Sequence, residues 1–152
     1  MSDQLLVFDL DFTLWDAGGT WCDHCTPPFQ QHPEGAEDRL GSIIKLYSDV
    51  LPVLHHCKSR AIPMALASRT ERPTWANELL DLLNINPFFA YREIYPGSKL
   101  QHFQALHHQS RISYDKMLFF DDEIRDDLIC RISVSALLKR FCHNDLFCIL
   151  PI

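Results

Sequence analysis

The amino-acid sequence predicts an α/β fold in which helices cover both faces of a mainly parallel β-sheet. Short apolar runs at 4–10, 62–67 and 116–120 alternate along the chain with segments that have helical spacing. The runs are apolar without a regular polar alternation, which is typical of parallel strands buried on both faces. Together, the alternation of elements and the composition of the strands indicate a three-layer arrangement.

The N-terminal half begins with the strand predicted at 4–10, followed by a long segment of different composition. Residues 16–41 are predicted as loop, because they hold four of the five glycines and three of the nine prolines. Residues 42–47 fit either a short strand or a turn of helix. A helix is predicted over 48–61, where a capping signal precedes an apolar stripe. The residues expected on that stripe are Val50, Leu51, Val53, Leu54 and Cys57.

The following segments continue the alternation of strands and helices. After the strand at 62–67, we expect a helix at 72–85 with Thr74 as its cap, a strand at 88–95 and a helix at 98–110. The residues expected to face inward from these two helices are Trp75, Leu79, Leu80, Leu82, Leu83, Leu100, Phe103 and Leu106. The last elements expected are a helix over 123–141 and an edge strand over 146–152.

Length and charge narrow the possible classes of protein. A chain of 152 residues with 47% apolar residues suggests one domain over 1–152 with a real core. The net charge of −6 provides no basic surface for nucleic acid or anionic lipid. No apolar run approaches the roughly 18 residues of a membrane-spanning helix, and the N-terminus lacks the features of a signal peptide. We therefore expect a cytoplasmic monomer.

Cys22 and Cys25 have the C-x-x-C spacing of some metal and redox sites. A zinc site needs a second pair of ligands, and a thioredoxin-like pair opens a helix, whereas this one runs into "TPPF". We interpret the two residues as loop thiols that stay reduced in the cytosol.

Polar side chains follow three of the predicted strands. The residues are Asp9, Asp11 and Thr13 after the first strand, Ser68 and Arg69 after the second, Asp121 and Asp122 after the strand at 116–120, and Lys99 at the start of a helix. Each alone fits a helix cap, a turn or a solvated side chain. Because the carboxyl ends of parallel strands meet at one edge of a sheet, we expect them to lie together.

Four carboxylates at one edge repel one another unless a cation lies among them. Oxygen ligands of this kind suit Mg²⁺, which typically takes one or two carboxylates together with substrate phosphate and water. The sequence therefore predicts Mg²⁺ as a cofactor at this edge of the sheet.

The motifs resemble those of a known superfamily. "DLDFT" is similar to the D-x-D-x-T motif of the haloacid dehalogenase superfamily, and Ser68, Lys99 and "FFDDE" resemble its next three motifs in order. A closer resemblance is to the eukaryotic magnesium-dependent phosphatases, a capless family of the acid phosphatase type. It is carried by "VFDLDFTLW", "PPF", "ASRT", "REIYPGSK" with a following "HF", and "FFDDE", and it covers residues 5 to about 126.

The resemblance implies roles for the polar residues at the strand ends. Asp9 would be the nucleophile that forms an aspartyl-phosphate, and Asp11 the general acid and base. Asp9, Asp122 and the backbone carbonyl of Asp11 would ligate Mg²⁺, with Asp121 in support. The residues expected to contact substrate are Leu10, Asp11, Thr13, Ser68, Arg69 and Lys99. For Arg69, contact with phosphate and exposure to solvent remain equal alternatives.

The resemblance implies a Rossmann-like domain, and the spacing of its motifs leaves no room for a cap domain. The segments between Thr13 and Ser68 and between Ser68 and Lys99 are too short to hold a separate domain of typical size. An open site would admit a phosphorylated protein as well as a small molecule, and it favours good leaving groups such as aryl phosphates. The substrates that the resemblance implies are phosphotyrosine and phosphorylated sugar adducts of proteins.

Two regions leave alternatives open. The segment 15–30 could form a wall beside the site, but we favour a hydrophobic mini-cluster that only pins the loop. Residues 127–152 are atypical of the family, because Asp126 replaces an Asn and no glycine follows Gly97. The chain is therefore predicted to be a Mg²⁺-dependent phosphatase, and the alternative is a catalytically weak or inactive scaffold of the same fold.

Overall fold

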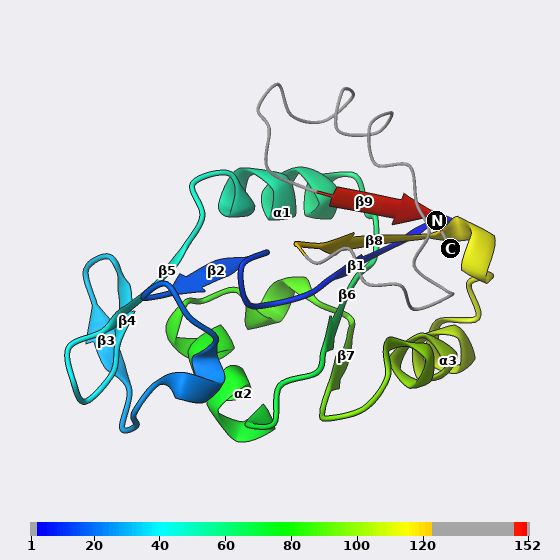
Figure 1. Ribbon diagram of the computed structural model, residues 1–152. Coiled ribbons are helices and arrows are strands. Elements are labelled where there is room, and N and C mark those ends of the chain that lie inside the picture. The colour runs from blue at the N-terminus through cyan, green and yellow to red at the C-terminus, as the bar shows by residue number, and fades with distance from the viewer. Residues whose placement is uncertain (1–2, 123–147, 152) are drawn as a thin grey trace.

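The computed structural model describes residues 3–122 and 148–151, and its centre is a five-stranded sheet (Figure 1). The strands are β1 (Leu5–Phe8), β6 (Met64–Ser68), β7 (Tyr91–Ile94), β8 (Met117–Asp121) and β9 (Cys148–Pro151). Their order is β7-β6-β1-β8-β9. The first four are parallel, and β9 pairs with β8 in the antiparallel direction. The predicted mainly parallel sheet is confirmed.

Helices pack on both faces of this sheet, as the apolar strands predicted. Leu6 and Phe8 of β1 belong to the core cluster that contains residues of α1 (Val50–Ser59) and α2 (Pro73–Leu82). Leu5 and Val7 belong to a second cluster, with Phe103 and Leu106 of α3 (Lys99–Ser110). Since neighbouring residues of a strand point to opposite faces, a strand covered on both sides must be apolar throughout.

A second sheet lies beside the first, at the left of Figure 1. Its strands are β2 (Trp15–Ala17), β3 (Gln30–His32), β4 (Gly35–Glu37) and β5 (Ile43–Leu46), in the antiparallel order β2-β5-β4-β3. The single-turn helix η1 (Cys22–His24) lies between β2 and β3. The prediction of loop throughout 16–41 was therefore wrong where these strands and η1 form, and of the two alternatives for 42–47 the strand is correct, at Ile43–Leu46.

The second sheet escaped prediction because its strands are short and rich in polar residues. β2, β3 and β4 have three residues each, and β3 is the polar segment QQH. Gly35 was interpreted as a loop residue. Its φ is +149°, and a Cβ atom there would collide with the carbonyl oxygen of Ile44 on the neighbouring strand. Glycine therefore permits this close pairing of β4 and β5.

Several details of the helices differ from the predictions. Leu51 and Leu100 are exposed, because the buried stripes run through Val50, Leu54 and Cys57 in α1 and through Lys99, His102, Phe103 and Leu106 in α3. Thr74 is not a cap. Helix α2 begins at Pro73, whose fixed φ suits the first helical position. The edge strand is confirmed over 148–151, and the predicted helix over 123–141 lies outside the described residues.

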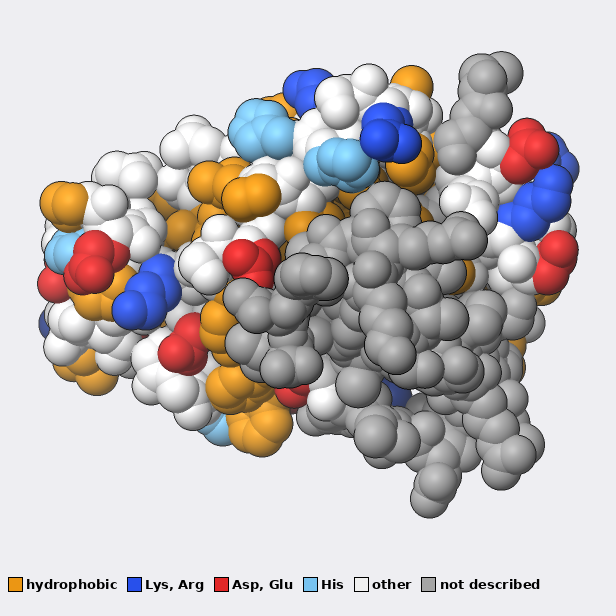
Figure 2. All heavy atoms as spheres, turned by 90° about the horizontal axis from the view of Figure 1, so that it is seen from above, with side chains coloured by type: hydrophobic (Ala, Val, Ile, Leu, Met, Phe, Trp, Pro, Cys, Tyr) orange, Lys and Arg blue, Asp and Glu red, His pale blue; other side chains and the backbone are white. Residues whose placement is uncertain are grey.

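The described surface carries charges of both signs. Figure 2 shows acidic and basic side chains interspersed on this face, without a large basic patch among the described residues. No helix in the described residues is long and apolar enough to cross a membrane. The expected absence of a nucleic-acid partner stays a prediction.

Candidate active site

A pocket of about 530 Å³ opens where β1, β6 and β8 end. The topology explains its position, because the three strands are parallel neighbours and their carboxyl ends meet at one edge. The residues that line it are Asp9, Asp11, Trp21, Asp23, His24, Ser68, Arg69, Thr70, Glu71, Arg72, Lys99, Asp121 and Asp122. Most of the predicted site residues are therefore brought together.

Asp9 lies directly after β1 and pairs with the buried Lys99. The Nζ of Lys99 donates to Asp9 Oδ1 at 2.9 Å, and it also donates to the carbonyl oxygen of Ala67 in β6. Lys99 is the first residue of α3, which begins with a capping box between Ser98 and Gln101. The helix start therefore places one buried cation beside the proposed nucleophile.

Asp9, Asp121 and Asp122 form a cluster that fits a divalent cation. One carboxylate oxygen of each lies within 4.8 Å of the others. Burial and the nearby charge of Asp9 raise the pKa of Asp122 above its ordinary value, although a hydrogen bond with Asp121 lowers it. Neighbouring carboxylates repel one another when they are ionised, and a bound cation relieves this repulsion. Their oxygen atoms suit a hard cation such as Mg²⁺.

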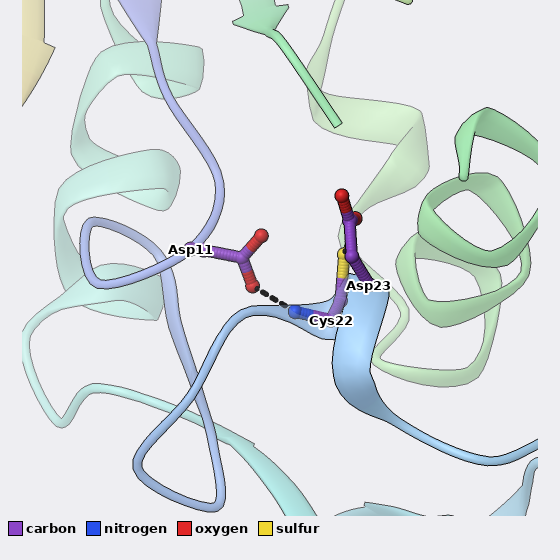
Figure 3. Close-up of side chains that lie close together, drawn as sticks. All are labelled: Asp11, Cys22 and Asp23. Atoms are coloured by element: carbon purple, nitrogen blue, oxygen red, sulfur yellow. Dashed lines mark hydrogen bonds between the residues drawn. The ribbon is translucent and has the colours of Figure 1, made fainter. Parts of the chain in front are cut away.

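Asp11 occupies a different environment from Asp9. Its side chain is buried, and Oδ1 accepts hydrogen bonds from Trp15 Nε1 at 2.7 Å and from the backbone N–H of Cys22 at 2.8 Å. Figure 3 shows the carboxylate of Asp11 beside Cys22 and Asp23. Burial raises the pKa of Asp11 to about 6, although the hydrogen bonds from Trp15 and Cys22 oppose this shift. An acid that is partly protonated near neutral pH is suited to proton transfer.

A tight turn after Asp11 determines where the next residues lie. Phe12 has a φ of +59°, and its N–H donates to the carbonyl oxygen of Trp15 at 2.8 Å. The side chain of Leu10 is fully buried in the core, and Thr13 is buried with no hydrogen-bond partner for its hydroxyl among the described residues. Neither residue lines the pocket, so their contact with substrate stays a prediction.

Ser68, the last residue of β6, and Arg69, the first residue of the loop that follows, line the pocket, and this loop is tied to a distant segment. Ser68 Oγ accepts from the N–H of Thr70 at 3.4 Å. Asp23 accepts from the Thr70 hydroxyl and from the N–H of Glu71, the latter at 3.0 Å. Asp23, on η1, therefore holds the loop that directly follows Ser68. Arg69 also lines the pocket, and its contact with phosphate stays a prediction.

Six residues of the pocket were not among the predicted catalytic, substrate and metal residues: Trp21, Asp23, His24, Thr70, Glu71 and Arg72. Their nearness to Ser68 in the sequence was a usable signal for the last three, because loops at the carboxyl ends of strands line such sites. The first three come from the segment 15–30. Both interpretations of that segment apply, since Trp15 and Phe29 are buried in the core while Trp21, 48% exposed, lines the pocket.

Cys22, Cys25 and Cys57 are free thiols. Cys22 lies on η1 and Cys25 lies directly after it, outside any helix or strand, and both are buried in the core cluster. Burial and the nearby carboxylates raise the pKa of both thiols, that of Cys25 to about 11. Thiols in this state are protonated at neutral pH and are therefore poor nucleophiles.

Comparisons with known proteins agree with this arrangement. The sequence model of a family described as acid phosphatase matches residues 2–140. The chain is 45% identical over 125 residues to "Magnesium-dependent phosphatase 1" of Homo sapiens, covering 81% of this chain and 69% of that protein. It is 37% identical over 149 residues to a "HAD-like hydrolase superfamily protein" of Schizosaccharomyces pombe, covering 90% and 85%.

A solved structure supports the fold. It is described as a predicted phosphoglycolate phosphatase from Haemophilus somnus, and it superposes with a TM-score of 0.56 at 15% identity. The superposition covers 78% of this chain and 77% of that one. At this level of identity, the similarity establishes the three-layer Rossmann-like architecture alone.

Proposed function

The chain belongs to the acid phosphatase family within the haloacid dehalogenase superfamily, and we propose that it is a Mg²⁺-dependent phosphomonoesterase that works through an aspartyl-phosphate on Asp9. The observation that carries this proposal is the pairing of two carboxylates with opposite surroundings in one pocket. Asp9 contacts a buried cation, whereas Asp11 is held by neutral donors and has a raised pKa. Different surroundings of this kind allow one carboxylate, Asp9, to act as the nucleophile and the other, Asp11, to act as the acid.

The proposed reaction has two steps. A carboxylate oxygen of Asp9 attacks phosphorus while the bond to the leaving oxygen breaks, and Asp11 gives that oxygen its proton. Water then attacks phosphorus in the aspartyl-phosphate while the ionised Asp11 takes a proton from that water, and the bond between Asp9 and phosphorus breaks to release inorganic phosphate. Lys99 and Ser68 lie in the pocket at positions that suit contact with the phosphoryl oxygens.

Asp9, Asp121 and Asp122 offer the oxygen ligands for Mg²⁺, and the backbone carbonyl of Asp11 is a further proposed ligand. When bound, Mg²⁺ supplies the positive charge that allows an acidic pocket to accept a phosphate. One relative is named as a magnesium-dependent phosphatase, which supports this choice of ion.

Removal of the metal tests the proposal directly. EDTA should abolish the hydrolysis of p-nitrophenyl phosphate, and an excess of Mg²⁺ should restore it. Isothermal titration of the chelated protein with Mg²⁺ should show one site that is lost in Asp122→Asn. Full activity in EDTA would disprove the metal requirement.

For the substrate, we propose aryl phosphates, including phosphotyrosine on proteins, as the preferred class over phosphorylated sugar adducts. Trp21 supports this choice, because it is a half-exposed aromatic ring in the pocket that contacts Phe12 and His24 edge to face. The protein would act as a cytoplasmic monomer. The alternative of an inactive scaffold rests on residues 127–152, nearly all of which lie outside the described residues.

A turnover screen tests the substrate class. A phosphotyrosine peptide should give a higher kcat/KM than a phosphoserine peptide or a sugar phosphate. Trp21→Ala should reduce the ratio of these kcat/KM values by roughly tenfold, which corresponds to the free energy of about one aromatic contact. A strict preference for one sugar phosphate would instead contradict the aryl phosphate proposal.

A further inference from the structure

Trp15 contacts Asp11, the proposed acid, and this contact has no part in the reaction proposed above. Its indole Nε1 donates to Asp11 Oδ1 at 2.7 Å, and the backbone N–H of Cys22 donates to the same oxygen at 2.8 Å. Figure 3 shows the second of these bonds, with the other oxygen of Asp11 pointing away from Cys22. The two donors therefore converge on one of the two carboxylate oxygens.

The position of the Trp15 ring is determined by its surroundings. Trp15 is fully buried and is the first residue of β2, where it pairs with Leu46 of β5. Its carbonyl oxygen also accepts from the N–H of Phe12, which closes the turn after Asp11. A buried indole N–H without an acceptor is costly, so the ring and the carboxylate stabilise each other's position.

We propose that Trp15 is a positioning residue that determines which oxygen of Asp11 transfers the proton. A carboxyl oxygen has two lone pairs, and at Oδ1 two N–H donors occupy them. The proton of the acid is therefore carried by Oδ2, which gives it to the leaving oxygen and later takes another proton from the attacking water. This inference rests on the proposed phosphatase function and specifies one residue's part in it.

The contact can be tested without any turnover. In a ¹H–¹⁵N spectrum of the metal-free protein, the indole N–H of Trp15 should resonate downfield of those of Trp21 and Trp75. Asp11→Ala should move the Trp15 signal upfield and leave that of Trp75 in place. A Trp15 signal that does not move would overturn the proposal, whatever the activity of the protein.

The role is tested by leaving-group dependence. Replacing Trp15 with benzothienylalanine keeps the shape of the ring and removes the N–H. We expect kcat/KM for phenyl phosphate, whose leaving group needs a proton, to fall roughly tenfold, and that for p-nitrophenyl phosphate to fall less than about threefold. The matched control is the same replacement at Trp75, which lies outside the pocket and should leave both values unchanged.

A second variant separates positioning from folding. Trp15→Phe should show the same leaving-group dependence, and in an Asp11→Asn background neither change at Trp15 should reduce activity further, since the residue acts through Asp11. Equal losses on both substrates, or full additivity with Asp11→Asn, would overturn the proposal. A wild-type protein that hydrolyses neither substrate would overturn the phosphatase function and this role together, while the indole signal would still report the contact.

Discussion

The two aspartates of the pocket stand two residues apart, yet the molecule holds them by different means. Asp9 follows β1 and contacts Lys99, a cation placed at the start of α3. Asp11 lies beyond the sheet, where the second sheet and η1 supply two neutral N–H donors from Trp15 and Cys22. One side of the pocket is therefore organised by charge and the other by buried hydrogen bonds.

The difference shows how one short motif can supply two chemical roles. A nearby cation stabilises an ionised carboxylate, whereas burial stabilises a protonated one. The pKa of Asp11 is raised to about 6 chiefly by burial, even though two donors oppose the shift. The second sheet thus contributes to the chemistry by removing water from around Asp11.

The strongest test of this division compares the two aspartates by mutation. Asp9→Asn should lower activity by on the order of 10³-fold or more on every substrate, because no covalent intermediate forms. Asp11→Asn should retain measurable release of p-nitrophenolate, which leaves without a proton, and should lose far more on phenyl phosphate. Stopped-flow kinetics would measure both, with Asp3→Asn as a surface control. Normal activity in Asp9→Asn would end its assignment as the nucleophile.

The charged side of the pocket can be tested by a comparison of two ion pairs. Lys99→Met removes a buried partner of Asp9, so we expect about 10²-fold lower kcat/KM and, in EDTA, a free energy of unfolding lower by about 3 kcal/mol. Lys116→Met breaks the exposed pair with Asp3, whose atoms are 3.4 Å apart, and should cost about 0.5 kcal/mol or less. Urea unfolding would measure both. Equal costs would show that burial of the Lys99 pair has no consequence.

The last prediction concerns stability alone and a buried acid in the turn between β4 and β5. Asp38 accepts from the N–H groups of Thr26, Leu40 and Ser42 at 2.8–2.9 Å, and these bonds outweigh burial and hold its pKa below the ordinary 3.8. Its stabilisation is therefore complete above the unfolded pKa and is lost as pH falls through the lower folded value. Asp38→Asn should cost about 1–2 kcal/mol at pH 7 and less below pH 3.8.

Urea unfolding at pH 7 and at acid pH would measure this dependence. The control is Glu34→Gln, at an exposed residue in the turn between β3 and β4, which should change stability little at either pH. A cost for Asp38→Asn that is the same at both pH values would contradict the lowered pKa. Unchanged hydrolysis of p-nitrophenyl phosphate in this variant would further show that its effect is confined to stability.

The sequence by itself determined the parallel sheet and the charged side of the pocket. Both depend on local properties of the sequence. These are the continuous apolar character of β1, β6 and β8 and the polar residues at their carboxyl ends. Once the strands are parallel neighbours, their carboxyl ends meet, so Asp9, Ser68 and Asp122 could be placed in one pocket before any contact was known.

Only the tertiary structure decided how the other side of the pocket is built. The second sheet has short strands with polar residues, so no periodic pattern marked it. The contacts it makes possible join residues far apart in the chain, as when Asp23 holds Thr70. Such pairs leave no local signal, because each residue alone is compatible with a solvated loop. The buried donors to Asp11 and the raised pKa that accompanies them are therefore properties of the folded chain alone.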